Sequence, residues 1–238
     1  MKLLLDAGNS RLKWGVHDGE CWQAQGAVSH EQIAQLATQW AAWPVDSVYA
    51  ASVARPAVAD AITQAAPCPV QWVRSAASFA DVRNHYRNPA EQAAVRWLAV
   101  LAARSLCAGD VVVACAGTAL TVEALSAEGD YLGGMILPGQ ALMLRSLAQG
   151  TAQLDRMAGQ VTAFQQGTED ALASGVLAAQ CGAIERMCRQ LAAQTGRPAP
   201  QLLLTGGDAA SIAAQLAVPA TIVDNLVLMG LLRVACES

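Results

Sequence analysis

The sequence has no cluster of basic residues and no long apolar run. Its 15 Lys and Arg are outnumbered by 19 Asp and Glu, the net charge is −4, and the pI is about 5.3. This balance argues against a nucleic-acid surface. No uninterrupted apolar stretch reaches the roughly 18–20 residues that a membrane helix needs. The N-terminus runs through three leucines into Asp6, which is not typical of a signal peptide. We therefore expect no nucleic-acid partner, no membrane partner and a cytoplasmic protein.

Residues that commonly bind metals are scattered. The seven cysteines form no CxxC pair, and the three histidines, His17, His30 and His85, lie far apart in the sequence. Neither residue type shows the spacing of a metal site. We interpret the cysteines as reduced thiols, most of them small core residues.

Hydrophobic residues make up 54% of the 238 positions, which allows one large domain or two small ones with a sizeable core. The opening stretch Leu3–Leu5 is typical of a short strand buried on both faces. A tight hairpin turn is predicted next, formed by Asp6, Ala7, Gly8, Asn9 and Ser10. Gly8 lets a backbone pass close to a ligand, consecutive N–H groups can hold an anion, and Asp6 could bind a metal ion beside it. The alternative is an ordinary Asn/Gly hairpin turn.

Strand and helix patterns alternate through the rest of the first half. Ser29 with Gln32 predicts a capped helix start, and 82–89 is predicted to be a polar loop. We expect strands at 11–16, 21–28, 47–53 and 70–73, and helices at 29–40, 56–66 and 90–106.

The opening pattern of strand, glycine-bearing turn and strand recurs in the second half. A buried strand at 111–114 leads into the small-residue turn Cys115–Ala119, and strand 201–204 leads into Thr205–Asp208. We expect further strands at 120–125, 131–137 and 220–223, and helices at 140–148, 168–193, 208–216 and 225–235. Duplicated βββαβα halves with such turns are typical of an ATP-binding phosphotransferase, because phosphates bind where strands end and helices begin.

Four ordered motifs resemble the type III pantothenate kinases, a family that includes proteins known as Bvg accessory factors. These motifs are Asp6–Ser10, Ala116–Val122, Gly133–Gly139 and Leu204–Ala209. The resemblance implies an α/β fold shared by acetate and sugar kinases, heat-shock chaperones and actin, with a cleft between the halves 1–108 and 109–238. Packing of the last helix back on the first half is left open. It also implies transfer of a phosphoryl group from ATP to pantothenate, the first step of coenzyme A biosynthesis. Mg²⁺, a monovalent cation (K⁺ or NH₄⁺) and a homodimer are further implications.

The resemblance also assigns roles by position. Asp6 to Ser10 form the first phosphate turn, with Asp6 as the metal-orienting carboxylate and Lys13 as a further phosphate-binding residue. Gly117 and Thr118 form the second phosphate turn, and Gly206 and Gly207 lie near the nucleoside. The pantothenate contacts correspond to Tyr86, Ala93, Arg96 and Thr151.

This chain departs from the family pattern at acidic positions. Val95 stands where the family usually has the Asp that acts as general base, and Cys115 stands where it has an Asp linked to the monovalent cation. Glu123 replaces another usual Asp, and Asp155 a usual Pro. Glu91 is a candidate replacement base, because on a helix it would share a face with Val95, and Glu123 is a candidate cation ligand. The alternatives are a degenerate relative that binds nucleotide or acts in regulation, and a kinase for another hydroxyl.

Overall fold

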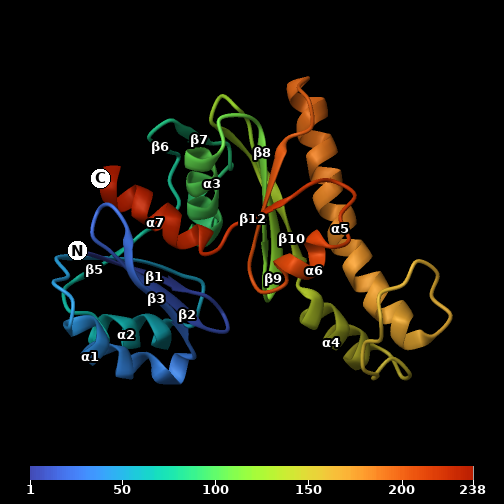
Figure 1. Cartoon of the computed structure of the whole chain (residues 1–238), viewed down its shortest axis with the longest axis horizontal. Coiled ribbons are helices and arrows are strands. Elements are labelled where there is room, and N and C mark those ends of the chain that lie inside the picture. Colours follow the sequence, from blue (N-terminus) through green and yellow to red (C-terminus); the bar gives the residue numbers. More distant parts are fainter. Residues whose placement is uncertain (238) are drawn as a thin grey trace. The chain divides into compact units, whose positions relative to one another are not determined.

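The computed structural model describes residues 1–237, which fall into two compact units (Figure 1). The first unit consists of Met1–Leu106 and the described residues from Asn225 onward, and the second of Cys107–Asp224. The elements of the first unit are β1 (Lys2–Ala7), β2 (Leu12–His17), β3 (Trp22–Val28), η1 (His30–Gln35), α1 (Leu36–Ala41), β4 (Ser47–Ser52), α2 (Pro56–Ala65), β5 (Val70–Trp72), β6 (Ser78–Phe79), β7 (Val82–Asn84), η2 (Pro89–Glu91), α3 (Ala94–Leu106) and α7 (Leu226–Glu237).

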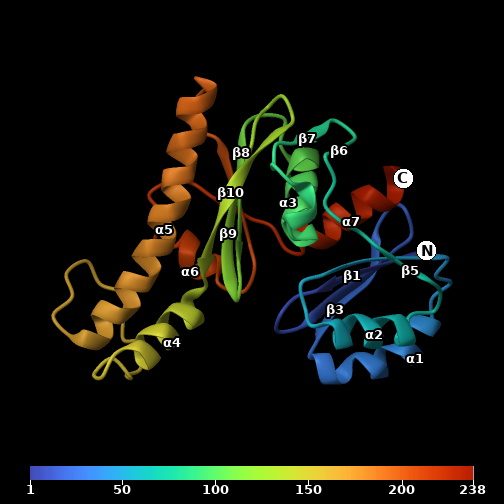
Figure 2. The same ribbon diagram turned by 180° about the vertical axis from the view of Figure 1, so that it is seen from behind.

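The first unit is built on a sheet with the strand order β3-β2-β1-β4-β5. Strands β1 to β3 are antiparallel neighbours, whereas β4 pairs parallel with β1 and with β5. Apolar side chains of β1, among them Leu3 and Leu5, pack with Ile33, Trp40 and Ile62 from η1, α1 and α2 on one face. Figure 2 shows α1 and α2 covering that face. Helix α7 contacts β1 and also packs along α3. The last helix of the chain therefore completes the first unit.

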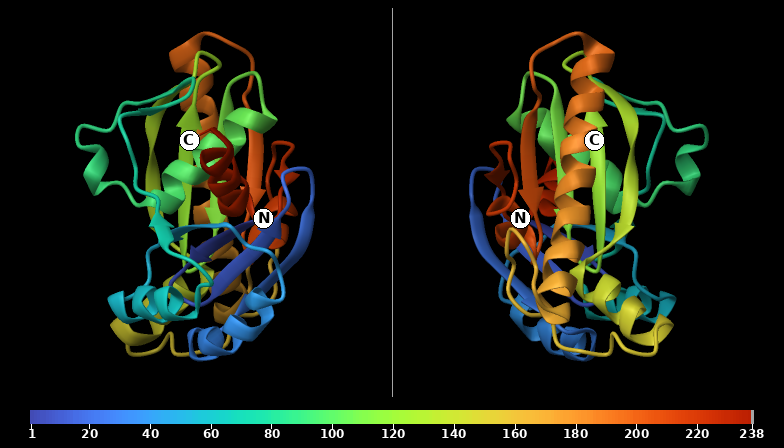
Figure 3. Two further views of the ribbon diagram at one scale, coloured as in Figure 1. Left: turned by 90° about the vertical axis from the view of Figure 1, so that its left-hand side faces the viewer. Right: turned by 90° about the vertical axis from the view of Figure 1, so that its right-hand side faces the viewer.

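The second unit is built on strands in the order β12-β11-β8-β9-β10. Its elements are β8 (Val111–Ala116), β9 (Ala119–Leu125), β10 (Asp130–Pro138), α4 (Gln140–Gly150), α5 (Thr168–Thr195), β11 (Gln201–Thr205), α6 (Ala209–Ala213) and β12 (Thr221–Ile222). The long helix α5 lies along one face of β8 and β9 (Figure 3). There Ile184 and Leu191 pack against Val112, Ala114 and Val122.

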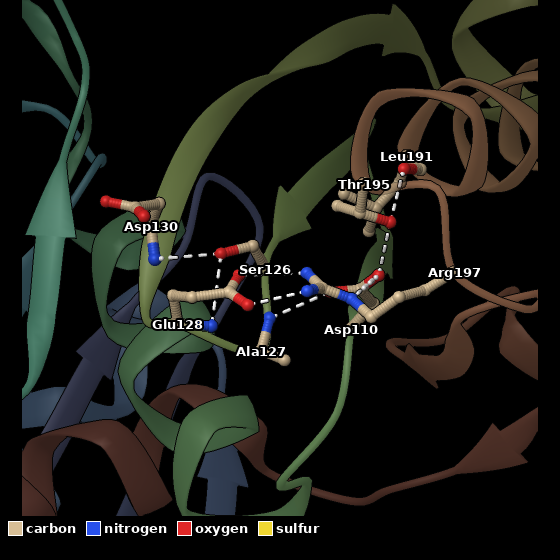
Figure 4. A network of polar contacts seen from close by, with 8 residues as sticks. All are labelled: Asp110, Ser126, Ala127, Glu128, Asp130, Leu191, Thr195 and Arg197. Atoms are coloured by element: carbon tan, nitrogen blue, oxygen red, sulfur yellow. Dashed lines mark hydrogen bonds and ion pairs between the residues drawn. The ribbon is translucent and has the colours of Figure 1, made fainter.

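A charged network joins three segments of the second unit (Figure 4). The carboxylate of the buried Asp110 accepts hydrogen bonds from Thr195 Oγ1 (2.6 Å), from Arg197 Nη2 (2.6 Å) and from the backbone N–H of Ala127 (2.8 Å). Arg197 also pairs with Glu128. These contacts attach the end of α5 to the start of β8 and to the β9–β10 turn.

Three local expectations need correction. The helix expected at 29–40 begins as the 3₁₀ segment η1, although Ser29 N–H does bond to Gln32 Oε1 (3.2 Å). The helix expected at 90–106 begins only at Ala94, because Gln92 has extended backbone angles after the short η2. The segment 82–89, expected to be a loop, starts with β7, which pairs antiparallel with β6. The observed units divide after Leu106, and the last helix belongs to the first unit, the packing that the sequence had left open. Within residues 1–237, no helix is long and apolar enough to cross a membrane.

Candidate active site

The first predicted phosphate turn joins β1 to β2. The N–H of Gly8 donates to Arg11 O (3.1 Å), and the carbonyl oxygen of Gly8 lies 3.0 Å from Nε2 of His30. Asn9 and Ser10 are exposed at the tip of the turn. A Cβ added at Gly8 would lie 3.4 Å from Arg11 O, an ordinary contact, so the chain itself does not require glycine there. The backbone of the turn is held from both sides, and its tip is open to a ligand.

Asp6 precedes this turn and lies opposite Lys13 in the β1–β2 ladder. Its side chain is on the face of β1 opposite to Leu5 and Ala7, because successive strand residues alternate. Burial raises the pKa of Asp6 from 3.8 to about 6, and the positive charge of Lys13 offsets part of that rise. Within residues 1–237, no hydrogen bond reaches this carboxylate. A part-buried carboxylate without hydrogen bonds suits a hard cation such as Mg²⁺, which commonly takes one or two protein carboxylates with phosphate oxygens and water.

The second and third turns lie together in the second unit. Gly117 N–H donates to Ala119 O (3.1 Å), closing the turn between β8 and β9, and Asp208 N–H donates to Ala116 O (3.2 Å). Gly206 has a φ of +103°, and a Cβ there would lie 2.1 Å from Ala116 O. Only glycine fits this position, because both the backbone angle and the space exclude a side chain. The structure thus brings Gly117 and Thr118 beside Gly206.

Gly139 is a further residue of this group that is absent from the predicted site residues. Its N–H donates to Thr118 O (2.9 Å), and a Cβ there would lie 2.0 Å from Gly117 O. Gly139 is the N-cap of α4, so the first turn of this helix begins beside the second phosphate turn. Unpaired N–H groups at a helix start favour anions. The signal was present in the sequence as Pro138-Gly139 at the end of the third motif.

Tyr86 and Arg96 form the polar pair of the first unit. The Arg96 Nη1 donates to the Tyr86 hydroxyl (2.8 Å), and the guanidinium carbon lies 5.5 Å from the centre of the Tyr86 ring. Arg96 is buried in the first turn of α3, and its N–H bonds to the Ala93 carbonyl (3.0 Å). The structure therefore places three of the four predicted substrate residues around the start of α3.

Two predicted residues lie apart from these groups. Glu91 is exposed in η2 and accepts a hydrogen bond from Asn88 Nδ2 (3.0 Å). The premise that it shares a helix face with Val95 is wrong, because α3 starts three residues later. Thr151 is the C-cap of α4, so the length of that helix separates it from the N-cap Gly139 by roughly 18 Å.

Two of the four positions that depart from the family pattern, Cys115 and Glu123, lie on the same sheet. Cys115 is opposite Thr121 in the β8–β9 ladder, and Glu123 is opposite Val113. Glu123 is fully buried, and its carboxylate accepts a hydrogen bond from the Tyr131 hydroxyl (2.7 Å). No group of three His, Cys, Asp or Glu within residues 1–237 could hold a metal ion. A neutral thiol at Cys115 suits K⁺ poorly, since that ion prefers oxygen ligands.

Comparison with known proteins decides the family. The model of the type III pantothenate kinase family matches residues 2–190. This chain belongs to that family. A type III pantothenate kinase of Chromobacterium violaceum is 63% identical over 235 residues, which cover 99% of each chain. One of Aromatoleum aromaticum is 46% identical, covering 100% of this chain and 98% of the relative.

Solved structures show the fold. A conserved putative Baf family transcriptional activator from Campylobacter jejuni aligns with a TM-score of 0.63 and 21% identity, covering 99% of this chain and 98% of the other. A putative 2-dehydro-3-deoxygalactonokinase from Sinorhizobium meliloti aligns with a TM-score of 0.63 and 14% identity at the same coverage. The chain has the α/β fold of sugar kinases and actin, as its motifs predicted. Membership of the family supports the assignment of the turns, but the roles of single residues stay predictions.

Proposed function

We propose that this protein transfers the γ-phosphoryl group of ATP to the hydroxyl of pantothenate, the first step of coenzyme A biosynthesis. The observation that carries this proposal is the family match along most of the chain, with named kinases that share its full length. The placement of the predicted turns supports it, since each directly follows a strand: β1, β8 or β11.

The chain's own groups suit the binding of ATP phosphates. In the second unit, α4 begins at its N-cap Gly139 beside the turn Gly117–Thr118, and the first turn of a helix offers backbone N–H groups to an anion. In the first unit, Asn9 and Ser10 offer a second exposed turn. Phosphoryl transfer depends mainly on positioning and on neutralising charge. Asp6 is the carboxylate that would hold Mg²⁺, which would neutralise phosphate charge when bound.

Tyr86 and Arg96 suit the polar groups of pantothenate, which carries a carboxylate. A guanidinium held against a phenol by a hydrogen bond and by its ring is a preorganised donor.

Val95 and Cys115 lower the turnover rate that we expect. A general base contributes roughly 10²- to 10⁴-fold, so its absence predicts slow turnover. The same two residues are the only observation that favours a degenerate, nucleotide-binding relative.

The decisive experiment is an assay of ATP-dependent phosphorylation of pantothenate, with and without K⁺. We expect the wild type to form 4′-phosphopantothenate slowly, and the Val95→Asp, Cys115→Asp double variant to form it faster. If the wild type is as fast as the double variant, the interpretation of the two substitutions is wrong. If neither protein turns over and neither binds ATP, the kinase proposal itself fails.

The use of K⁺ or NH₄⁺, a cytoplasmic location and a homodimer are parts of the same proposal. They rest on the family, and for the cation Glu123 remains the candidate ligand. The homodimer also has support on the surface of the second unit. Met157 and Phe164 are 86% and 89% exposed in the segment between α4 and α5, which is unusual for large apolar side chains.

A further inference from the structure

A cluster of three neutral polar side chains, of which Gln92 is buried and Ser75 and Asn84 are part-buried, holds the loop that carries Tyr86. Gln92, only 4% exposed, lies at the end of this loop, and its Oε1 accepts hydrogen bonds from Ser75 Oγ (2.6 Å) and Asn84 Nδ2 (2.8 Å). Ser75 comes from the segment before β6, and Asn84 is the last residue of β7. The side chains of Asn84 and Gln92 thus join the two ends of the loop 85–91.

The orientation of both amides follows from backbone partners. Asn84 Nδ2 donates to the Ala76 carbonyl (2.9 Å), and Asn84 Oδ1 accepts the N–H of Tyr86 (3.0 Å). A carbonyl only accepts and an N–H only donates, so the Asn84 amide has one possible orientation. Gln92 must then turn its oxygen toward Asn84. Its Nε2 is buried and has no hydrogen-bond partner within residues 1–237.

A buried amide whose oxygen is hydrogen-bonded but whose nitrogen is not lowers the stability of the fold. Another effect of Gln92 should therefore offset this loss. The gain that the contacts indicate is a closed loop: fixing both ends of a short segment reduces the conformations open to it. Asn84 fixes the backbone of Tyr86, and the Tyr86 hydroxyl meets Arg96 at 2.8 Å. We propose that Gln92 is a positioning residue, which holds the loop 85–91 so that Tyr86 and Arg96 together present one preformed binding surface to pantothenate. This inference rests on the proposed function.

The test is the Gln92→Met variant, which keeps the side-chain length and removes the acceptor. We expect the KM for pantothenate to rise about tenfold, because losing hydrogen bonds of this kind costs about that factor in the population of the closed loop. The KM for ATP and kcat should stay within about twofold. Backbone amides of 84–92 should exchange hydrogen faster without substrate. Gln71→Met, at an exposed position on β5, is the matched control and should change none of these quantities.

Two further variants keep the test independent of folding. Ser75→Ala removes one donor without a large cavity and should give a smaller rise in the same KM. Asn84→Ala combined with Gln92→Met should cost no more than Asn84→Ala alone, because residues that act as one unit are not additive.

The proposal is overturned if Gln92→Met leaves amide exchange and the pantothenate KM unchanged. It is also overturned if the KM for ATP rises equally, since that result indicates general damage to the unit. If the wild type forms no phosphopantothenate, the proposed function fails by itself, and amide exchange in 84–92 still decides whether Gln92 holds the loop.

Discussion

At the scale of single residues, Asp6 shows a conflict between stability and function. Its carboxylate is part-buried on β1 without a hydrogen bond, and burial raises its pKa to about 6. A group whose pKa is raised on folding stabilises the folded state at low pH and loses that contribution as pH rises through the folded pKa. At neutral pH the ionised Asp6 therefore lowers the stability of the folded protein. Such a loss of stability is common where function needs the group, and here the negative charge is needed to bind a cation.

The Asp6→Asn variant tests this cost. In metal-free buffer at pH 8 it should be more stable than wild type by at most about 3 kcal/mol, the equivalent of a pKa change from 3.8 to about 6. The gain should shrink as pH falls through 6 and vanish below 4, while kinase activity falls by roughly 10²-fold or more. Urea unfolding over this pH range measures the stability difference, with Asp60→Asn on the exposed side of α2 as control. A less stable Asn variant at pH 8 would contradict the argument.

At the scale of elements, local pattern predicted most strands and the three turns, because a buried strand followed by glycine and small polar residues is a short-range signal. The start of α3 could not be predicted in this way. Ala90 to Ala94 contain no strong helix breaker, and the helix is delayed because Gln92 turns toward Ser75 and Asn84, residues up to 17 positions away. Gly139 was missed for a similar reason, since its close approach to Gly117 depends on the sheet.

The Asp110 network is the element-scale feature that pH should reveal. Burial alone would raise the pKa of Asp110, but hydrogen bonds from Arg197, Thr195 and Ala127 N–H outweigh it and hold the pKa below 3.8. Such a group stabilises the fold above its unfolded pKa, and the contribution is lost as pH falls through the folded pKa. We expect Asp110→Asn to lose about 2 kcal/mol of unfolding free energy at pH 7.

Denaturant unfolding at several pH values measures this loss. The difference between Asp110→Asn and wild type should be the same at pH 7 and pH 5, and it should shrink below pH 4. Asp224→Asn, at an exposed position of the same unit, provides the comparison and should show little change at any pH. A difference that grows on acidification would mean that Arg197 does not stabilise the ionised form.

At the scale of the whole molecule, the order of elements predicted two similar α/β halves, and the resemblance of the four motifs to a known family implied the fold. The pattern of strands and helices recurs in each half, and the resemblance to known solved folds agrees with it. The sequence did not predict which unit the last helix packs on. Its residues follow the second unit in sequence, yet α7 packs on α3 and β1. The apolar residues of a helix predict that it is buried against another element, but the hydrophobic pattern does not identify that element.

The proposed homodimer concerns the surface of the second unit formed by α4, α5 and the segment between them. An apolar groove between α4 and α5 is lined by Met143, Leu147, Leu172 and Val176, among others, and the segment joining the two helices carries the exposed Met157 and Phe164. We call this surface the α4–α5 patch and propose that a second copy of the chain covers it, since exposed apolar side chains in one region are typical of an interface.

Changing Met157 and Phe164 together to Asp should convert the dimer to a monomer. Both side chains are largely exposed, so burying two charges in the interface should weaken association without unfolding the chain. Sedimentation velocity should give twice the 24.7 kDa chain mass for the wild type and one chain mass for the variant. Ile222→Asp, at a 49% exposed position on β12, should remain a dimer. If the wild type sediments as a monomer at every concentration, the α4–α5 patch is not a dimer interface. If the double variant still dimerises, the interface lies elsewhere, because an interface at this patch would bury the new charges unpaired.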